Sequence, residues 1–144
     1  MVRILVVDDT PKAREHLAAA AHLPGTEVVT AGSAKEAVQK IADETFAVVV
    51  TDLKMETNEA GLEVLKAAKK KDTYTQVIVI TAYGTQEVGV RTMRLGGFDY
   101  LEKNFPGTDV FAMVRSKVNQ ALEFRNAKLR EIGGRWTDLF QQTR

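Results

Sequence analysis

Residues 4–9 read Ile-Leu-Val-Val-Asp-Asp, a short apolar run that ends in two acids. Similar short runs return along the chain at Val28–Ala31, Phe46–Thr51, Val77–Thr81 and Phe98–Leu101. Runs this short and this continuously apolar are typical of strands buried on both faces, although a buried helix segment can look the same. The stretches between them have helical spacing and are long enough for the crossovers that parallel strands require. The sequence therefore predicts five β/α repeats.

Helix start signals agree with this pattern. Thr10 precedes Pro11, which places an N-cap residue before a proline at the first helical position, and residues 33–36 read Ser-Ala-Lys-Glu, a capping box. The predicted helices are 11–22, 33–44, a segment that opens at Gly61, Gln86–Leu95 and a segment after Pro106. The alternation indicates the α/β class, with an open, doubly wound, five-stranded parallel sheet that carries helices on both faces.

The composition excludes several classes of function. The 144 residues suffice for one core and are few for two ordinary domains. The net charge of +1 gives no general attraction to nucleic acid or membrane. The absence of cysteine excludes disulfides and thiolate sites and fits a reducing, cytoplasmic location. The first residues are unlike a signal peptide, and no apolar segment approaches the length of a membrane span.

Polar side chains gather where the predicted strands end. Asp8 and Asp9 follow the first strand, Asp52 the third, Thr81 the fourth and Lys103 the fifth. In doubly wound sheets the ligand site lies at these carboxyl ends. Any one acid here could simply cap a turn. Three ionised acids packed together repel one another. Two unit charges about 4 Å apart repel by about 4 kcal/mol at an effective dielectric of 20. The cluster therefore requires a cation. Because only oxygen donors are on offer, the expected metal is Mg²⁺ or Mn²⁺.

Four motifs at these positions occur in the order and spacing of a known family. They are Val7-Asp-Asp9, Val50-Thr-Asp-Leu-Lys-Met55, Ile80-Thr-Ala-Tyr-Gly84 and Asp99-Tyr-Leu-Glu-Lys103. Together they resemble the signature of the response regulator receiver domain of two-component systems, over residues 1 to about 120, and are similar to receivers of enhancer-binding transcription regulators. The resemblance implies a flavodoxin-like (βα)5 fold and phosphoryl transfer from a histidine kinase or phosphotransfer protein.

The resemblance also implies a role for each acid. Asp52 would be the nucleophile that forms an acyl phosphate, since a carboxylate is already ionised and needs no base. Asp9, Asp52 and the backbone carbonyl of Lys54 would hold the metal directly, and Asp8 would act mainly through water. The metal would neutralise charge on the transferring group. The chain would be a signalling domain and not an enzyme, although it would assist its own phosphorylation and dephosphorylation.

The other matching residues imply a conformational switch. Lys103 would pair with a phosphoryl oxygen, and Thr81 would donate a hydroxyl hydrogen bond to it. Tyr100 matches the aromatic residue of the family that turns inward when the hydroxyl of Thr81 moves to phosphate. The changed surface would be the fourth helix, fifth strand and fifth helix, roughly Gln86–Phe124, which could signal to an effector or form a homodimer.

Three departures from the family pattern limit the analogy. Asn104 follows Lys103 where the family usually has a proline in a cis peptide, so this bond is either trans or strained. The loop of residues 55–61 lacks the usual proline and is one residue longer than the common form. Lys54 and Tyr83 occupy the positions at which the family controls the entry of water. Partner choice and phosphate lifetime are therefore not predicted.

The carboxyl-terminal segment exceeds the family's last helix. Apolar residues at three- and four-residue steps predict a continuation of the fifth helix as a possible coiled-coil stripe, interrupted at Gly133-Gly134. The stripe consists of Val114, Val118, Leu122, Arg125, Leu129, Ile132, Trp136 and Leu139. We therefore divide the chain into a receiver domain at 1–124 and a helical extension or linker at 125–144. The extension could mediate dimerisation, and no direct nucleic-acid binding is expected from it.

Three other functions compete with this interpretation. A haloacid dehalogenase-type phosphatase also uses an aspartate nucleophile and Mg²⁺, but usually carries an acid two residues later, where this chain has Lys54. A flavodoxin-like cofactor binder would need small residues after the first strand, where Asp8 and Asp9 would repel phosphate. A degenerate receiver that serves as an interaction or dimerisation scaffold would require that the changes at 55–61 and Asn104 spoil the site.

Overall fold

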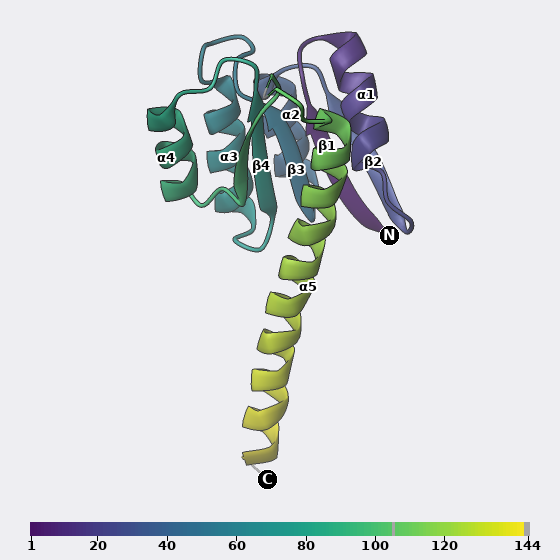
Figure 1. Cartoon of the computed structure of the whole chain (residues 1–144). Helices are drawn as coiled ribbons and strands as arrows, with labels where there is room; N and C mark the ends of the chain where they lie inside the picture. The colour runs from purple at the N-terminus through teal and green to yellow at the C-terminus, as the bar shows by residue number, and fades with distance from the viewer. Residues whose placement is uncertain (105, 143–144) are drawn as a thin grey trace.

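The fold is one parallel sheet with helices on both faces (Figure 1). The computed structural model describes residues 1–104 and 106–142, and the side chains of 134–142 lie outside the described part. The strand order is β2-β1-β3-β4-β5. The strands are β1 Val2–Val7, β2 Thr26–Ala31, β3 Val48–Asp52, β4 Gln76–Thr81 and β5 Asp99–Glu102. The helices are α1 Pro11–Ala21, α2 Ala34–Asp43, α3 Ala60–Lys71, α4 Gln86–Arg94 and α5 Val110–Gln142. The predicted doubly wound α/β fold is confirmed.

Alternation along the buried strands divides the core in two. Leu5 and Val7 of β1 point to the face covered by α2 and α3, whereas Ile4 and Val6 point to the face covered by α1 and α5. All four side chains are fully buried. A strand with helices on both sides has no solvent-facing side, and this explains why the sequence shows continuous apolar runs where a half-exposed strand would alternate.

The start of α2 differs slightly from the predicted capping box. The helix begins at Ala34, and Ser33 is its N-cap, with its hydroxyl accepting a hydrogen bond from the backbone N–H of Glu36 at 3.0 Å. The carboxylate of Glu36 accepts from the N–H of Gly32 at 2.8 Å, one residue before the cap itself. The cap therefore also fixes the turn that leads from β2 into the helix.

The fifth helix begins and continues differently from the prediction. It starts at Val110, several residues beyond Pro106, because the carboxylate of Asp109 accepts hydrogen bonds from the N–H groups of Phe111 and Ala112 at 3.0 and 3.1 Å. The predicted interruption at Gly133-Gly134 is wrong, since the helix runs on to Gln142. Glycine weakens a helix interior by about 1 kcal/mol but does not forbid helical dihedral angles.

The second half of α5 extends away from the sheet and its helices (Figure 1). Val114, Val118 and Ala121 are buried against the sheet, whereas Phe124 and Leu129 farther along are more than a third exposed. The side chains of Trp136 and Leu139, which complete the predicted stripe, lie outside the described residues. Within the described part of the chain, no helix combines the length and apolar character of a membrane span.

Candidate functional site

The polar residues predicted at the strand ends meet at one edge of the sheet. The strand order reverses direction between β1 and β3, and Asp8, Asp9 and Asp52 lie beside this switch point. Each of these acids offers a carboxylate oxygen within 4.8 Å of the others. Thr81 ends the neighbouring strand β4, and Lys103 follows β5 directly. The topology thus brings together five residues that are up to 95 positions apart in the chain.

Asp8 is fully buried and anchored from two sides. One carboxylate oxygen accepts a hydrogen bond from the backbone N–H of Thr10 at 2.9 Å, and the other accepts from the ammonium of Lys103 at 3.0 Å. The guanidinium of Arg14 donates to the backbone carbonyl of the same residue at 2.9 Å. A buried charge needs such partners, so the position of Asp8 depends on Lys103.

Asp52 contacts the same lysine as Asp8, but at a longer distance. Its carboxylate accepts a hydrogen bond from the backbone N–H of Leu53 at 2.9 Å, and its other oxygen lies 3.5 Å from the ammonium of Lys103. Burial raises the pKa of Asp52, the charge of Lys103 opposes this rise, and the charge of Asp8 adds to it. Lys103 alone therefore does not fully compensate the two buried acids, and a further cation near Asp52 would favour its ionised form.

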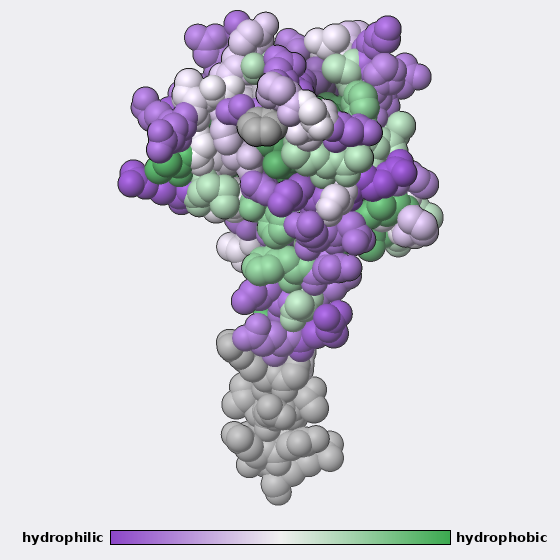
Figure 2. Space-filling model, viewed as in Figure 1, coloured by the Kyte–Doolittle hydropathy of each residue, from purple (hydrophilic) through white to green (hydrophobic). Residues whose placement is uncertain are grey.

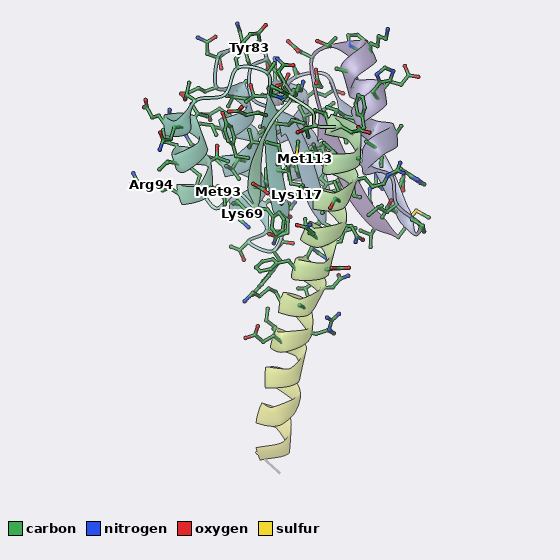
Figure 3. The ribbon with its side chains drawn as sticks, viewed as in Figure 1. Lys69, Tyr83, Met93, Arg94, Met113 and Lys117 are labelled. Atoms are coloured by element: carbon green, nitrogen blue, oxygen red, sulfur yellow. The ribbon has the colours of Figure 1, made fainter. Side chains whose placement is uncertain are left out.

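The exposed rim of the site contains Asp9, Lys54 and Tyr83. Asp9 is solvent-exposed, in contrast to Asp8 beside it. The ammonium of Lys54 lies 5.3 Å from the centre of the ring of Tyr83, within the range of a cation–π contact. Tyr83 is 74% exposed and lies above the strand ends (Figure 3). The family resemblance implies that both positions control the entry of water, but the sequence does not indicate that their side chains meet.

Thr81 and Tyr100 are connected through the loop that joins β4 to α4. The buried hydroxyl of Thr81 accepts a hydrogen bond from the backbone N–H of Tyr83 at 3.0 Å. The phenol oxygen of Tyr100 accepts from the N–H of Thr85 at 3.1 Å, and burial raises the pKa of this phenol. The peptide bond between Lys103 and Asn104 is trans, as are all peptide bonds in the described ranges.

The unusual loop at 55–61 is held on two sides by residues that the sequence did not single out. The carboxylate of Glu56 accepts from the N–H groups of Ala34 and Lys35 at 2.8 and 3.0 Å and so caps α2. Glu59 pairs with Arg91 of α4 through two hydrogen bonds. Both partners lie more than 20 positions away in the chain, and no local motif signals such contacts. The loop is therefore ordered although it departs from the family pattern.

Glu56→Ala is expected to lower the free energy of unfolding by about 1 kcal/mol, the usual value of a helix N-cap. Burial is the largest single influence and raises the pKa of Glu56, but the N–H groups of Ala34, Lys35 and Glu56 itself together outweigh it, and the net shift is downward. The difference from the parent should therefore be present at neutral pH and disappear as the pH falls through this lowered pKa. Urea unfolding of parent and variant, at neutral pH and at a pH below the lowered pKa of Glu56, measures this difference in the free energy of unfolding. Glu63→Ala, at an exposed ion pair with Lys66, is the control and should change little.

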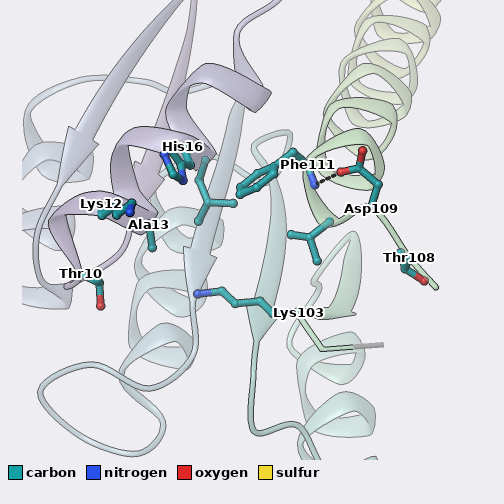
Figure 4. Close-up of a pocket in the computed structure, with 10 residues that line it drawn as sticks. Thr10, Lys12, Ala13, His16, Lys103, Thr108, Asp109 and Phe111 are labelled. Atoms are coloured by element: carbon teal, nitrogen blue, oxygen red, sulfur yellow. Dashed lines mark hydrogen bonds between the residues drawn. The ribbon is translucent and has the colours of Figure 1, made fainter. Parts of the chain in front are cut away.

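A hollow of about 640 Å³ opens beside Lys103, between α1 and the start of α5 (Figure 4). The imidazole of His16 and the ring of Phe111 meet edge to face across it, with ring centres 5.6 Å apart. Lys12 and Thr10 also line it.

Comparisons with known proteins agree with this geometry. The family model described as response regulator receiver domain matches residues 4–115. The C4-dicarboxylate transport transcriptional regulatory protein DctD of Pseudomonas aeruginosa is 30% identical over 141 residues, which are 92% of this chain and 30% of that protein. The regulatory protein AtoC of Escherichia coli is 34% identical over 126 residues, 88% of this chain and 26% of AtoC. The chain thus spans less than a third of either relative.

Solved structures give the same result at the level of the fold. The solution structure of the beryllofluoride-activated NtrC4 receiver domain dimer has a TM-score of 0.74 and 30% identity, and the match covers 87% of this chain and 99% of that one. The response regulator protein TrrA from Thermotoga maritima, in complex with Mg²⁺ and BeF, has a TM-score of 0.70 and 31% identity, over 85% of this chain and 100% of that one. This chain belongs to the response regulator receiver domain family.

Proposed function

We propose that Asp52 is the phosphoacceptor of this receiver domain. The observation that carries the proposal is the position of its carboxylate, at the end of the central strand β3, beside Asp8, Asp9 and the ammonium of Lys103 at 3.5 Å. In the reaction a carboxylate oxygen of Asp52 forms a bond to phosphorus while the bond from phosphorus to the donor breaks, leaving an acyl phosphate. The donor would be a histidine kinase or a phosphotransfer protein.

A divalent metal fits the charges at this site. The acids carry three negative charges when ionised, and only one ammonium, that of Lys103, contacts them among the described residues. Asp9, Asp52 and the carbonyl of Lys54 would hold the metal, with Asp8 contributing mainly through water, and an all-oxygen donor set suits Mg²⁺ or in its place Mn²⁺. When bound, the metal would neutralise charge on the transferring phosphoryl group.

Lys103 and Thr81 would contact the phosphoryl group once it is present. Lys103 already bridges Asp8 and Asp52, so the phosphoryl oxygens would share an ammonium that is in place. Thr81 would donate its hydroxyl hydrogen, because the hydroxyl oxygen acts only as an acceptor in its bond from the N–H of Tyr83. Tyr100 would respond through the same loop, as the switch residue of the domain.

The output surface would consist of α4, β5 and the first part of α5. Val90 and Met93 of α4 are 43% and 50% exposed, and apolar side chains lie among charged ones on α4 and α5 (Figures 2 and 3). This face, or the extension at 125–144 beyond the receiver at 1–124, would form a homodimer. We place the chain in the cytoplasm, as a signalling domain that assists its own phosphorylation and dephosphorylation, with no direct binding to nucleic acid or membrane.

The competing functions have less support. Lys54 occupies the place of the second acid of a haloacid dehalogenase-type phosphatase, and its side chain turns to Tyr83. A flavodoxin-like cofactor binder would have to place a phosphate next to Asp8, which is buried and paired with Lys103. The departures at 55–61 and Asn104 leave the acids within 4.8 Å of one another, so geometry gives no reason to regard the site as degenerate.

Incubation with acetyl phosphate tests the proposal directly. With Mg²⁺ present, intact-mass measurement should find one added phosphoryl group per chain, and chelation of the metal with EDTA should prevent the addition. Transfer from a small-molecule donor requires no partner protein, so the result depends on this chain alone. An unchanged mass over a range of donor and metal concentrations would contradict phosphoacceptor function and favour the scaffold alternative.

A further inference from the structure

Tyr100 lies against two glycines on the segment that follows Thr81. A Cβ atom added to Gly84 would lie 2.4 Å from the phenol oxygen of Tyr100 and 3.1 Å from the ring carbon that bears it. A Cβ added to Gly89 of α4 would lie 3.0 Å from Cδ1 of the same ring. Real Cβ contacts are essentially never shorter than 3.0 Å. The phenol and its ring thus occupy space that a side chain at either position would take.

Backbone conformation does not explain these glycines. The glycines with positive φ in the described part of the chain are Gly25, Gly96 and Gly107, so Gly84 and Gly89 have angles that other residues also adopt. Gly89 lies inside α4, where alanine would favour the helix by about 1 kcal/mol. Gly89 provides room for the ring of Tyr100. Gly84 provides room for its phenol oxygen and also for the carboxylate of Glu102, from which an added Cβ would lie 3.2 Å.

We propose that Gly84 and Gly89 form a seat for Tyr100, the glycine seat, and act as positioning residues for the switch. The proposal rests on the proposed function, because it assigns a means of coupling between the phosphorylation site and α4. A Cβ at Gly84 would displace the phenol of Tyr100, and a Cβ at Gly89 would move its ring by a few tenths of an ångström. Both changes would shift the balance between the two states of the domain.

The hydrogen bonds of the loop connect the glycine seat to Thr81. The hydroxyl of Thr81 accepts from the N–H of Tyr83, and two residues later the N–H of Thr85 donates to the phenol of Tyr100. The hydroxyl of Thr85 also accepts from the N–H of Val88 at 3.2 Å and caps α4. Movement of Thr81 toward a phosphoryl group therefore displaces the same four-residue loop, residues 82–85, that holds Tyr100 and leads into α4.

The direction of the effect follows from the contacts in this structure. Here Tyr100 occupies the glycine seat while Thr81 remains bonded to Tyr83. A variant that removes Tyr100 from the seat weakens this arrangement and makes the release of Thr81 easier. Gly84→Ala should therefore tighten the binding of beryllofluoride, a phosphoryl mimic, by about fivefold or more, the lower end of typical coupling between sites.

The test combines two measurements on the full chain. NMR of ¹³C-labelled tyrosine reports the position of the Tyr100 ring without any ligand, and titration with beryllofluoride in Mg²⁺ reports the coupling. The variants are Gly84→Ala and Gly89→Ala, each in the parent, Tyr100→Phe and Tyr100→Ala backgrounds. Gly133→Ala is the matched control, because a Cβ there meets no atom of the described residues within 4 Å. Thermal melting checks that each variant is folded, and Gly89→Ala is the milder change of the two.

The two glycines should respond differently to the loss of the phenol oxygen. The effect of Gly84→Ala should fall below twofold in Tyr100→Phe, because the atom 2.4 Å away has been removed. The effect of Gly89→Ala should persist in Tyr100→Phe and disappear in Tyr100→Ala, because its nearest neighbour is a ring carbon. Unchanged Tyr100 resonances in both glycine variants would overturn the glycine seat. Shifted resonances with unaltered or weaker beryllofluoride affinity would overturn the coupling, and a parent without any affinity would overturn the proposed function itself.

Discussion

Asp52→Asn is expected to abolish the incorporation of phosphoryl groups from acetyl phosphate. An amide lacks the negative charge that makes the carboxylate of Asp52 a nucleophile, and the buried neighbour Asp8 is not placed to replace it. Asp8 is fully buried and its two oxygens are occupied by Thr10 and Lys103. Intact-mass spectra of parent and variant after identical incubation should show one added group and none, respectively.

The matched control for this experiment is Asp43→Asn, which makes the same change at an exposed acid at the end of α2. It should leave the amount of phosphorylated protein unaltered. A phosphoryl group that persists in Asp52→Asn would show that another residue accepts it, and peptide mapping would then identify that residue. Asp9 would be the first candidate, because its carboxylate is exposed at the rim of the same cluster.

The strands could be predicted closely because burial on both faces leaves a strong sequence signal. The predicted strand bounds are wrong where a residue pairs with a neighbouring strand but is exposed, or is buried but does not pair. β1 and β2 extend back to Val2 and Thr26, which pair with each other although Val2 is exposed. Phe46, predicted as part of the third strand, is buried but precedes β3, and its carbonyl accepts a hydrogen bond from the hydroxyl of Thr75. Apolar runs report burial, whereas strand bounds depend on the partner strand.

The main site residues could be predicted because each lies directly at the end of a strand. Topology alone then brings Asp8, Asp52 and Lys103 together, whatever the loops do. The contacts of Glu56 and Glu59 could not be predicted, since each depends on where a distant helix starts or lies. Two acids in one loop favour a contact with a helix N-terminus or a cation, but they do not indicate which helix or cation it is.

The structural roles of the glycines are the features that the sequence predicts least well. The sequence indicates Gly61 only as a helix opening, yet a Cβ there would lie 2.2 Å from the backbone carbonyl oxygen of Asp52. Gly133 was read as an interruption, and the helix passes through it. A glycine provides either unusual dihedral angles or space, and only the neighbouring atoms show which of the two applies.

Asp52→Asn should also reverse its effect on stability when Mg²⁺ is added. Burial is the first cause that raises the pKa of Asp52, and the charge of Asp8 adds to it. An acid whose pKa is raised by folding contributes stability below its unfolded pKa, and this contribution is lost as the pH rises through the folded pKa. At neutral pH, in EDTA, the variant should therefore melt at a higher temperature than the parent, because it carries no unfavourable charge. At acidic pH this difference should shrink.

Saturating Mg²⁺ should stabilise the parent and leave the variant nearly unchanged. A ligand at a hundred times its Kd adds about 2.7 kcal/mol to the native state, which for a domain of this size raises the Tm by about 8 °C. The variant loses a carboxylate from the predicted metal site, so the order of the two melting temperatures should cross as Mg²⁺ is titrated. Asp43→Asn should follow the parent throughout. The metal is expected to relieve the repulsion between the carboxylates of Asp8 and Asp52. If the melting temperatures of parent and Asp52→Asn rise in parallel as Mg²⁺ is titrated, the metal binds elsewhere.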